Sequence, residues 1–271
     1  MKRYGSTSRW VLIGAMVLMM VVKAGVCRAE QPSAAAMAGF NTYVGALEAG
    51  LAAHRGQGGG LVVLAEPTAG TDARLRRGEL VLENLTPAKK DLPGAMLHHW
   101  RGTAFLPGAT AADAERIMRD FAVYPRIYAP QVVSARVLAQ NGNRCQATMR
   151  VKQKHVITVV MDTAYDIEFG QRDARRFWSN SRSTRIDEIG DAGTKDEHAL
   201  SPADQHGFLW RLNTYWAFDE RDGGLYMQIE SVSLTRSIPT GLGWVIGPFV
   251  ESVPRESLEF TLRATRYALR R

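Results

Sequence analysis

Six strand-like segments follow one another between residues 131 and 236 with no helical periodicity between them, and this run constrains the fold most strongly. In the third segment, apolar residues alternate with Asp162, Asp166 and Glu168, the period of a strand with one buried face. Asn141-Gly142 and Asp222-Gly223 are typical of tight hairpin turns. Parallel strands need long crossover connections, so the run predicts an antiparallel sheet and excludes a doubly wound one. The segments span residues 131–139, 144–154, 156–169, 174–188, 207–219 and 224–236.

A seventh strand and two helices flank this run. The strand is expected at 98–106, and Thr110 can cap a helix directly after it. Beyond Pro254, apolar residues recur at helical spacing to the end of the chain, after a turn predicted by the glycines and prolines of 239–248. The predicted fold class is α+β, with a curved seven-stranded antiparallel sheet wrapped round the long C-terminal helix. This packing would bury the helix stripe and the inward strand faces together.

The N-terminal part is predicted to divide into a signal peptide at 1–29 and an extension at 30–97, before a main domain at 98–271. In the extension, a helix is expected at 34–55 because Phe40, Val44, Leu47 and Leu51 recur at helical spacing before a glycine cluster. Short strands or extended segments are expected at 61–65 and 79–85, around a polar turn.

The signal peptide is inferred from a basic start, an apolar run of twelve residues at 11–22 and a cleavage site after Ala29. A membrane-spanning helix needs roughly 20 apolar residues, although an uncleaved anchor is kept as an alternative. We therefore expect export across the inner membrane, with the periplasm as the predicted location. Removing residues 1–29 leaves 29 basic against 27 acidic residues, so the charge predicts no nucleic-acid partner.

No motif in the sequence predicts catalysis, a metal or a cofactor. Gly241, Gly243 and Gly247 lack the following parallel strand that a dinucleotide site requires. His98 and His99 should point to opposite faces of a strand, which disfavours one shared ion. They are interpreted as polar strand-end residues, with one of them lining a cavity as the alternative. Cys145 would be unpaired in the mature chain and is predicted to be a small buried residue, with a reactive thiol as the alternative.

Three stretches of the chain resemble the START-like or SRPBCC superfamily: "DFAVYPRIYAPQVVSARVL" (120–138), "GGLYMQIESVSLTRSIP" (223–239) and "PRESLEFTLRATRYAL" (254–269). The resemblance covers roughly residues 98–271 and rests on element order more than on a sharp motif. It implies the helix-grip fold, in which a curved sheet and a C-terminal helix enclose an apolar cavity. The residues then expected to line that cavity are aromatic or aliphatic: Trp100, Tyr128, Met161, Tyr165, Trp210, Trp216, Met227, Trp244, Leu258 and Leu262.

Two polar groups have alternative interpretations. Ser179, Ser181 and Ser183 alternate along one face of a strand, either as a solvated face or as inward anchors for a ligand head group. Arg150, Lys152 and Lys154 form either a solvated face or a cationic rim. Trp244 and Ile246 are expected to gate the cavity mouth if one exists.

Three functions follow as hypotheses. The first is non-catalytic binding or transfer of a lipid or other apolar small molecule, with transient contact to a membrane surface. The second, implied by the resemblance, is a polyketide cyclase or aromatase-like activity that would use His98, Tyr165, Arg185 and Glu230. The third is a cell-envelope interaction module with a filled core, in which the helix at 34–55 docks a partner.

Overall fold

The computed structural model describes residues 31–64, 69–88, 92–154, 158–238 and 243–270, with only the backbone described for residue 69 and residues 243–251. Its longer helices are α2 (Ala34–Gly56), α3 (Ala69–Arg76), α4 (Ala111–Arg119) and α6 (Gly243–Ala268), with the short η1 (Phe121–Val123) and α5 (Tyr124–Ile127) after α4. No helix in these ranges is long and apolar enough to cross a membrane. The predicted signal peptide lies outside the described residues.

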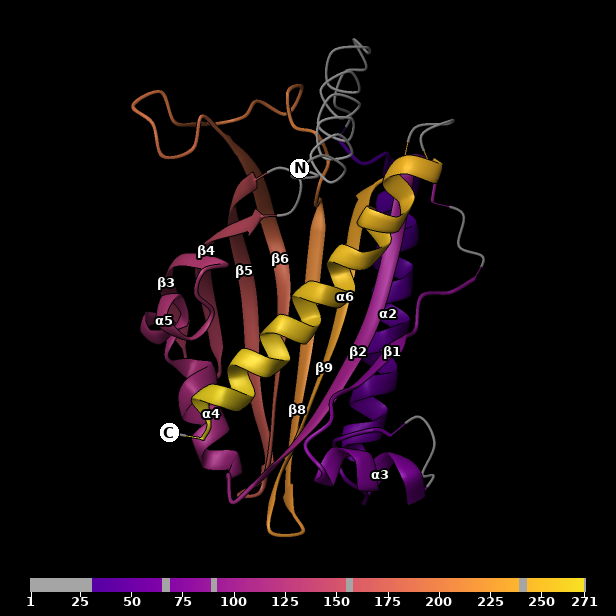
Figure 1. Cartoon of the computed structure of the whole chain (residues 1–271), viewed down its shortest axis with the longest axis vertical. Coiled ribbons are helices and arrows are strands. Elements are labelled where there is room, and N and C mark those ends of the chain that lie inside the picture. The colour runs from indigo at the N-terminus through magenta and orange to yellow at the C-terminus, as the bar shows by residue number, and fades with distance from the viewer. Residues whose placement is uncertain (1–30, 65–68, 89–91, 155–157, 239–242, 271) are drawn as a thin grey trace, which may run out of the picture.

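One antiparallel sheet organises the molecule, in the order β1-β2-β9-β8-β6-β5-β4-β3, with β7 attached to β6 (Figure 1). The sheet curves, and its two faces carry different helices (Figure 1). The strands are β1 (Val81–Asn84), β2 (Ala95–Pro107), β3 (Val132–Asn141), β4 (Arg144–Lys154), β5 (Thr158–Asp173), β6 (Arg176–Gly190), β7 (His198–Ala199), β8 (Arg211–Arg221) and β9 (Gly224–Arg236).

The concave face of the sheet carries α6, which crosses it diagonally from β2 and β9 towards α4 (Figure 1). Leu258 and Leu262 of α6 are buried against the sheet. Gly102 of β2 permits this approach, because a Cβ atom there would lie 2.6 Å from Leu258 Cδ2. The helix-grip packing predicted from the sequence is therefore confirmed.

The convex face of the same sheet is covered by the N-terminal helices. Phe40 and Val44 of α2 are buried against Leu97, Val232 and Leu234 of β2 and β9. Leu75 of α3 packs in a neighbouring cluster with Phe105 and Tyr226. The apolar stripe of α2 is thus covered by the chain's own sheet, which removes the reason for expecting a partner to dock there.

The seven expected strands are all present, and those at 144–154 and 224–236 match the predicted bounds. The Asp222-Gly223 hairpin also matches, with positive φ angles of 58° and 76°. Residues 61–64 form no strand, whereas the strand expected at 79–85 is present as β1. The polar turn expected between these segments was wrong, because α3 stands there, and β7 is a short strand that was not predicted. The turn expected to run to Pro248 was also wrong, because α6 begins at Gly243 and includes this proline. A proline fixes φ near −65°, which is compatible with a helix, although the helix loses one backbone hydrogen bond there.

Candidate functional site

The concave face is only partly covered by α6. The helix packs mainly on β2 and β9, at one side of the sheet. On the other side, two hydrogen bonds connect it to the wall: Tyr128 Oη to Thr265 Oγ1 at 2.9 Å, and Gln153 Nε2 to Ser257 Oγ at 3.3 Å. Burial raises the pKa of Tyr128 to about 12, so its hydroxyl stays neutral. Met149 of β4 and Ser181 of β6 belong to this wall, and each keeps part of its surface exposed.

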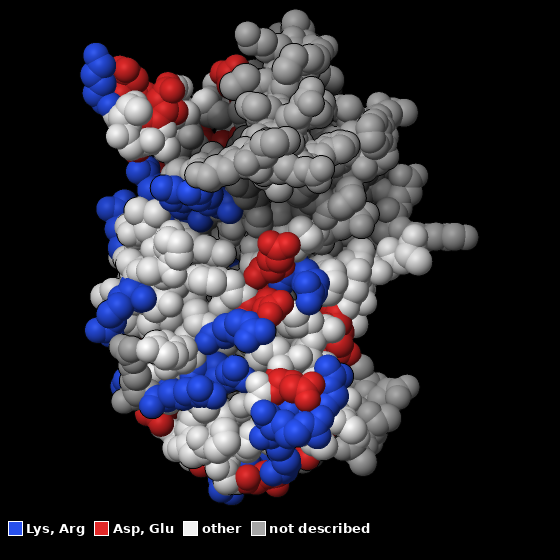
Figure 2. Space-filling view, in the orientation of Figure 1, with Lys and Arg blue, Asp and Glu red and all other residues white. Residues whose placement is uncertain are grey.

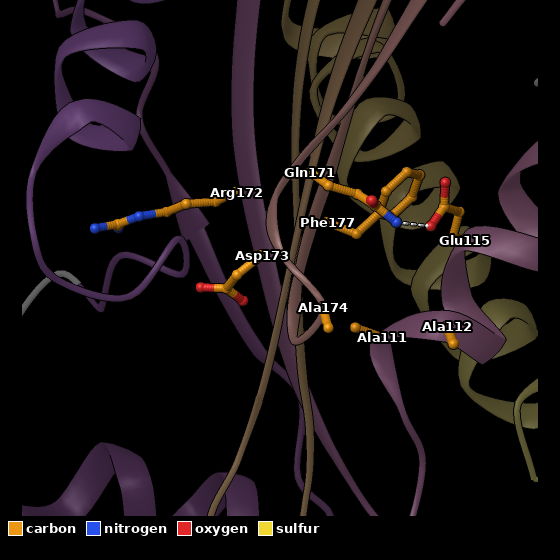
Figure 3. Close-up of a pocket in the computed structure, with 8 residues that line it drawn as sticks. All are labelled: Ala111, Ala112, Glu115, Gln171, Arg172, Asp173, Ala174 and Phe177. Carbon is orange, nitrogen blue, oxygen red and sulfur yellow. Dashed lines mark hydrogen bonds between the residues drawn. The ribbon is translucent and has the colours of Figure 1, made fainter.

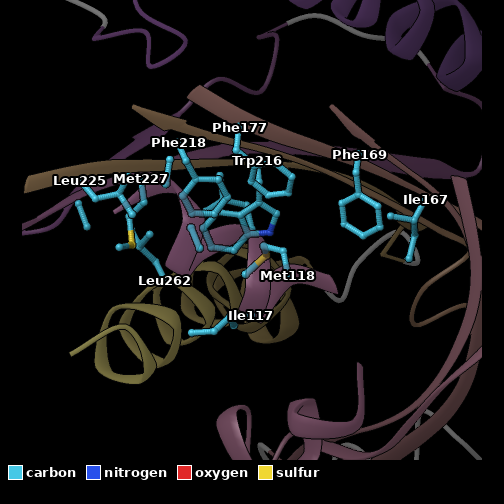
Figure 4. Close-up of a cluster of buried hydrophobic side chains, with 14 of the residues drawn as sticks. Ile117, Met118, Ile167, Phe169, Phe177, Trp216, Phe218, Leu225, Met227 and Leu262 are labelled. Carbon is cyan, nitrogen blue, oxygen red and sulfur yellow. The ribbon is translucent and has the colours of Figure 1, made fainter. Parts of the chain in front are cut away.

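An apolar floor fills the concave face towards the β8–β9 hairpin. Trp216 and Phe218 of β8 stack with ring centroids 5.3 Å apart, and Phe218 stacks on Phe177 of β6 at 5.7 Å. Figure 4 shows these rings facing Leu262 of α6 and Met118 of α4. This end of the concave face is a packed core, so any ligand must lie further along the strands, away from the β8–β9 hairpin.

A row of hydroxyl side chains crosses the concave face next to this floor. The strand register places Trp100 beside Ser231, Ser231 beside Thr214, and Thr214 beside Ser181. On β9, Ser231 shares its face with Ile229, and on β8, Thr214 shares its face with Trp216, each two residues away along the strand, so all four side chains point inward. The following row continues the pattern with Ser233 and Ser183. Three adjacent central strands thus present hydroxyls where a packed core would carry aliphatic residues.

Most of these hydroxyls have no hydrogen-bond partner among the described residues. Ser183 Oγ accepts the backbone N–H of Leu212 at 2.9 Å. The hydroxyls of Ser179, Ser181, Thr214, Ser231 and Ser233 make no such bond within the described ranges, although Ser179 and Ser233 are each only 5% exposed. In the same ranges, the side-chain atoms that are both sealed from solvent and unpaired are His54 Nε2 and Asp219 Oδ1. The five hydroxyl oxygens are therefore reachable from solvent through the concave side.

The structure places most of the predicted cavity residues on this face. Trp100 is half-buried beside the hydroxyl row, and Tyr128 is buried where α5 meets the end of α6. Trp210 is the exception, because it packs on the convex side with Phe40 and Val232. The side chains of Trp244 and Ile246 lie outside the described residues. The remaining predicted residues are buried and face inward: Met161, Tyr165, Trp216, Met227, Leu258 and Leu262.

The four residues considered for acid–base chemistry do not converge. His98 and Tyr165 are buried on the concave face, and burial raises the pKa of the Tyr165 hydroxyl. They stand on β2 and β5, which are separated by β9, β8 and β6. Arg185 lies on the surface with 67% of its side chain exposed, paired with Asp187, and Glu230 is on the convex face. The sequence alone could not reveal this separation, because alternation does not say which face is inward.

The convex face contains the charged cluster of the molecule, under α2. Tyr43 Oη lies 2.7 Å from His99 Nδ1, and His99 Nε2 lies 2.8 Å from Glu230 Oε2. Arg101 donates two hydrogen bonds to Glu230 Oε1, at 3.0 and 2.9 Å. Burial would raise the pKa of Glu230, but the hydrogen bond from His99 and the charge of Arg101 outweigh it and lower that pKa. His99 is therefore a buried part of this cluster, and its interpretation as a polar strand-end residue was wrong.

Glu188 closes the concave face at the end opposite the floor. Its carboxylate accepts the backbone N–H groups of His206, Gly207 and Phe208 at 2.9–3.1 Å, and it lies 2.8 Å from His206 Nδ1. Burial would raise the pKa of Glu188, but these hydrogen bonds outweigh it and lower that pKa. The carboxylate holds the 206–208 loop in place and has its acceptor sites occupied.

The other polar candidates either face solvent or are buried and chemically unreactive. Lys152 and Lys154 are exposed, and Arg150 pairs with Asp162 and Glu197 on the outer side, which fits a solvated face. Cys145 is buried on β4, and burial raises the pKa of its thiol, as expected for a small core residue. No group of three or more His, Cys, Asp or Glu among the described residues is arranged to hold a metal ion.

Two surface hollows lie away from the hydroxyl row. A pocket of about 470 Å³ lies between α4 and the β5–β6 hairpin, where Gln171 donates to Glu115 while Arg172 points away (Figure 3). Another, of about 360 Å³, contains Arg176, Asp219 and Arg221. Along the face that carries α6, basic and acidic side chains intermingle, including Glu259 with Arg255 and Arg263 (Figure 2). The described part of that face shows no single-sign patch that would favour a charged partner (Figure 2).

No family model matches the chain, and no curated protein matches it either. Among solved structures, the STAR-related lipid transfer protein from Xanthomonas axonopodis is 16% identical, with a TM-score of 0.47 over 70% of this chain and 99% of that one. The Zhui aromatase/cyclase from Streptomyces sp. R1128 is 13% identical, with a TM-score of 0.41 over 64% of this chain and 92% of that one. Human STARD10 is 8% identical, with a TM-score of 0.42 over 75% and 81%.

The chain has a helix-grip fold, as its own sheet order and C-terminal helix show. Because all three TM-scores lie below 0.5, we argue function from the chain's own concave face.

Proposed function

We propose that this helix-grip protein binds an apolar small molecule or lipid on its concave face and carries it without changing it. One observation supports this most: α6 leaves the wall of β4–β6 partly uncovered, although that wall carries apolar and uncharged side chains such as Met149, Met161 and Ser181. Binding would bury apolar ligand surface at roughly 25 cal/mol per Å², while a few polar groups orient the ligand. A carrier needs no converging acid and base, and none is found among the four residues considered above.

The test is to block the concave face with a bulky side chain. Ser181→Trp places an indole beside Thr214 and Ile167 in the middle of this face. Ser134→Trp is the matched control, because Ser134 is exposed on β3. We expect Ser181→Trp to lose binding of the neutral apolar dye Nile red while Ser134→Trp retains it, as measured by fluorescence titration. Equal binding by both proteins would refute this location.

Folding of the blocked variant is checked by far-UV circular dichroism. If Ser181→Trp does not fold, Met149→Trp enters the same face from β4 and serves instead. Organic extraction of the protein from its native envelope, followed by mass spectrometry, then identifies the natural ligand class. Recovery of protein with an empty, water-filled interior in every preparation would count against carriage.

Export is the second part of the proposal. It is motivated by the basic start, the apolar run at 11–22 and the small residue at position 29. Intact-mass analysis of periplasmic protein should find a chain that begins at Glu30. Recovery of the uncleaved chain from the membrane fraction would instead support an N-terminal anchor. Loading a lipid would require transient contact with a membrane surface. Cosedimentation of the protein with lipid vesicles would detect that contact.

A further inference from the structure

We propose that the ligand is a neutral amphiphile, whose hydroxyl or carbonyl head is held by Ser181, Thr214 and Ser231. This inference rests on the proposed function and specifies the chemistry of the same face. The three residues occupy one row across β6, β8 and β9. Neighbouring strands lie about 4.8 Å apart, so one small head group can reach two of these hydroxyls at once.

The hydroxyls are available to a ligand. Interior polar groups are almost always hydrogen-bonded, yet this row and its neighbours Ser179 and Ser233 have no partner among the described residues. Ser179 and Ser233 are each 95% buried on the inward face, and their hydroxyls stay reachable from the concave side. The described residues do not supply the missing partners, which leaves these hydroxyls open to water or to a ligand that displaces it.

The charges around the row indicate which head groups fit. In the rows of the sheet between Phe177 and Glu188, the described inward-facing strand residues include no Lys, Arg or Asp. His98 of β2 lies beside Ser233 in the next row, with its Nε2 atom 3.4 Å from Thr235 Oγ1. Glu188 has its oxygens occupied by His206, Gly207 and Phe208. A phosphate, carboxylate or ammonium head would lose hydration here without gaining a counter-ion, whereas a hydroxyl or ester carbonyl exchanges water for serine and threonine.

The apolar body of the ligand has surfaces on both sides of the row. Trp100 stands at one end of it, on β2. Met149 and Met161 line the opposite wall on β4 and β5, while Trp216 forms the floor one step along β8. A head group on Thr214 thus leaves an alkyl or ring system in contact with aromatic and thioether side chains, which are the groups that favour apolar contact.

The experiment compares three probes that share one oleoyl chain: 1-monooleoylglycerol, oleate and oleoyl lysophosphatidylglycerol. Each displaces Nile red from the full chain, below the concentration at which the probe aggregates. The test variant combines Thr214→Val with Ser231→Ala, which keeps the shape of the face and removes two hydroxyls. Thr184→Val is the matched control, because Thr184 is exposed on β6.

We expect 1-monooleoylglycerol to bind at least tenfold more tightly than either charged probe. The double variant should weaken its binding about tenfold, as the loss of one or two ligand hydrogen bonds predicts, and should leave oleate unchanged. Thr184→Val should change nothing. Equal or tighter binding of a charged probe, or an unaltered preference in the double variant, would overturn the head-group assignment while Nile red binding still supports carriage. Failure of Nile red itself to bind would refute the proposed function.

Discussion

Both faces of the central sheet carry helices, but the polar groups on the two faces differ in how they are paired. On the convex face, His99, Arg101 and Glu230 form a charged cluster with Tyr43 of α2, and its members satisfy one another. On the concave face, Thr214 and Ser231 are uncharged and have no partner among the described residues. These two residues alternate along β8 and β9 with Tyr215 and Glu230, so the difference arises within single strands.

This contrast separates groups that hold the protein together from groups that are free to bind. A satisfied buried charge cluster specifies how α2 lies on the sheet, and removing one member leaves the others unpaired. Uncharged hydroxyls that water can reach lower the stability of the ligand-free protein little, because water can hydrogen-bond to them. They can therefore bind a ligand without destabilising the protein when no ligand is present. The convex face is therefore structural, and the concave face is the one to test for function.

The largest expected effect comes from Glu230→Ala. This change leaves the Arg101 charge and His99 buried without their acceptor, 2.8–3.0 Å from the lost carboxylate oxygens. We expect the free energy of unfolding to fall by about 3–5 kcal/mol, measured from the urea midpoint and slope. Thr214→Val on the concave face is the reference and should cost under about 1 kcal/mol. Similar losses from both changes would remove the distinction between the faces.

An intermediate effect is expected where α6 meets the sheet. Gly102→Ala brings a Cβ atom to 2.6 Å from Leu258 Cδ2 and 3.1 Å from Leu262 Cδ2, so the helix or its leucines must move. We expect a loss of about 1–3 kcal/mol in the free energy of unfolding.

Gly45→Ala in α2 is the matched control for this change. Nothing lies within 4 Å of a Cβ atom at Gly45, and a glycine inside a helix is unfavourable by about 0.5–1 kcal/mol relative to alanine. The same chemical change should therefore stabilise the protein at Gly45. A stabilising Gly102→Ala would mean that α6 does not pack as closely as the structure shows.

The smallest effect concerns pH and the loop that closes the concave face. The hydrogen bond to Glu188 raises the pKa of His206 above its ordinary value, so the protonated ring stabilises the folded state. This contribution is complete below the unfolded pKa of about 6.5 and is lost as pH rises through the folded value. Because 46% of the side chain is exposed, solvent screening limits it to under about 0.5 kcal/mol.

The measurement for this prediction is urea unfolding of the wild type and His206→Gln at pH 6 and pH 8. The wild type should lose slightly more stability than the variant between the two values, because only the wild type releases the proton from residue 206. Glu188 contributes with the opposite sign: its lowered pKa gives stability above about pH 4.3 that is lost as pH falls. An identical pH response in both proteins would show that the His206 contact carries no net energy.

Local patterns were sufficient for most of the elements and their order, but not for α3, β7 or the start of α6. The strands at 144–154 and 224–236 were predicted to the residue, because alternation and the Asn-Gly and Asp-Gly turns depend only on neighbouring residues. The buried, inert role of Cys145 also followed from its place in an alternating strand. The helix-grip arrangement followed once the strand run and the terminal helix were recognised, because few packings bury both.

Which face of each strand points inward was decided by the tertiary structure. Alternation placed Glu230 and Ser231 on opposite faces but did not say that Glu230 would meet Arg101 beneath α2, or that Ser181 would face the concave side. The side on which a strand buries a residue depends on contacts with β2, α2 and α6, which are distant in the chain. The sequence by itself determined the strands, the hairpins and the terminal helix, because short-range sterics and hydrophobic periodicity set them. Only long-range packing decided that the hydroxyls line one face and the charges the other.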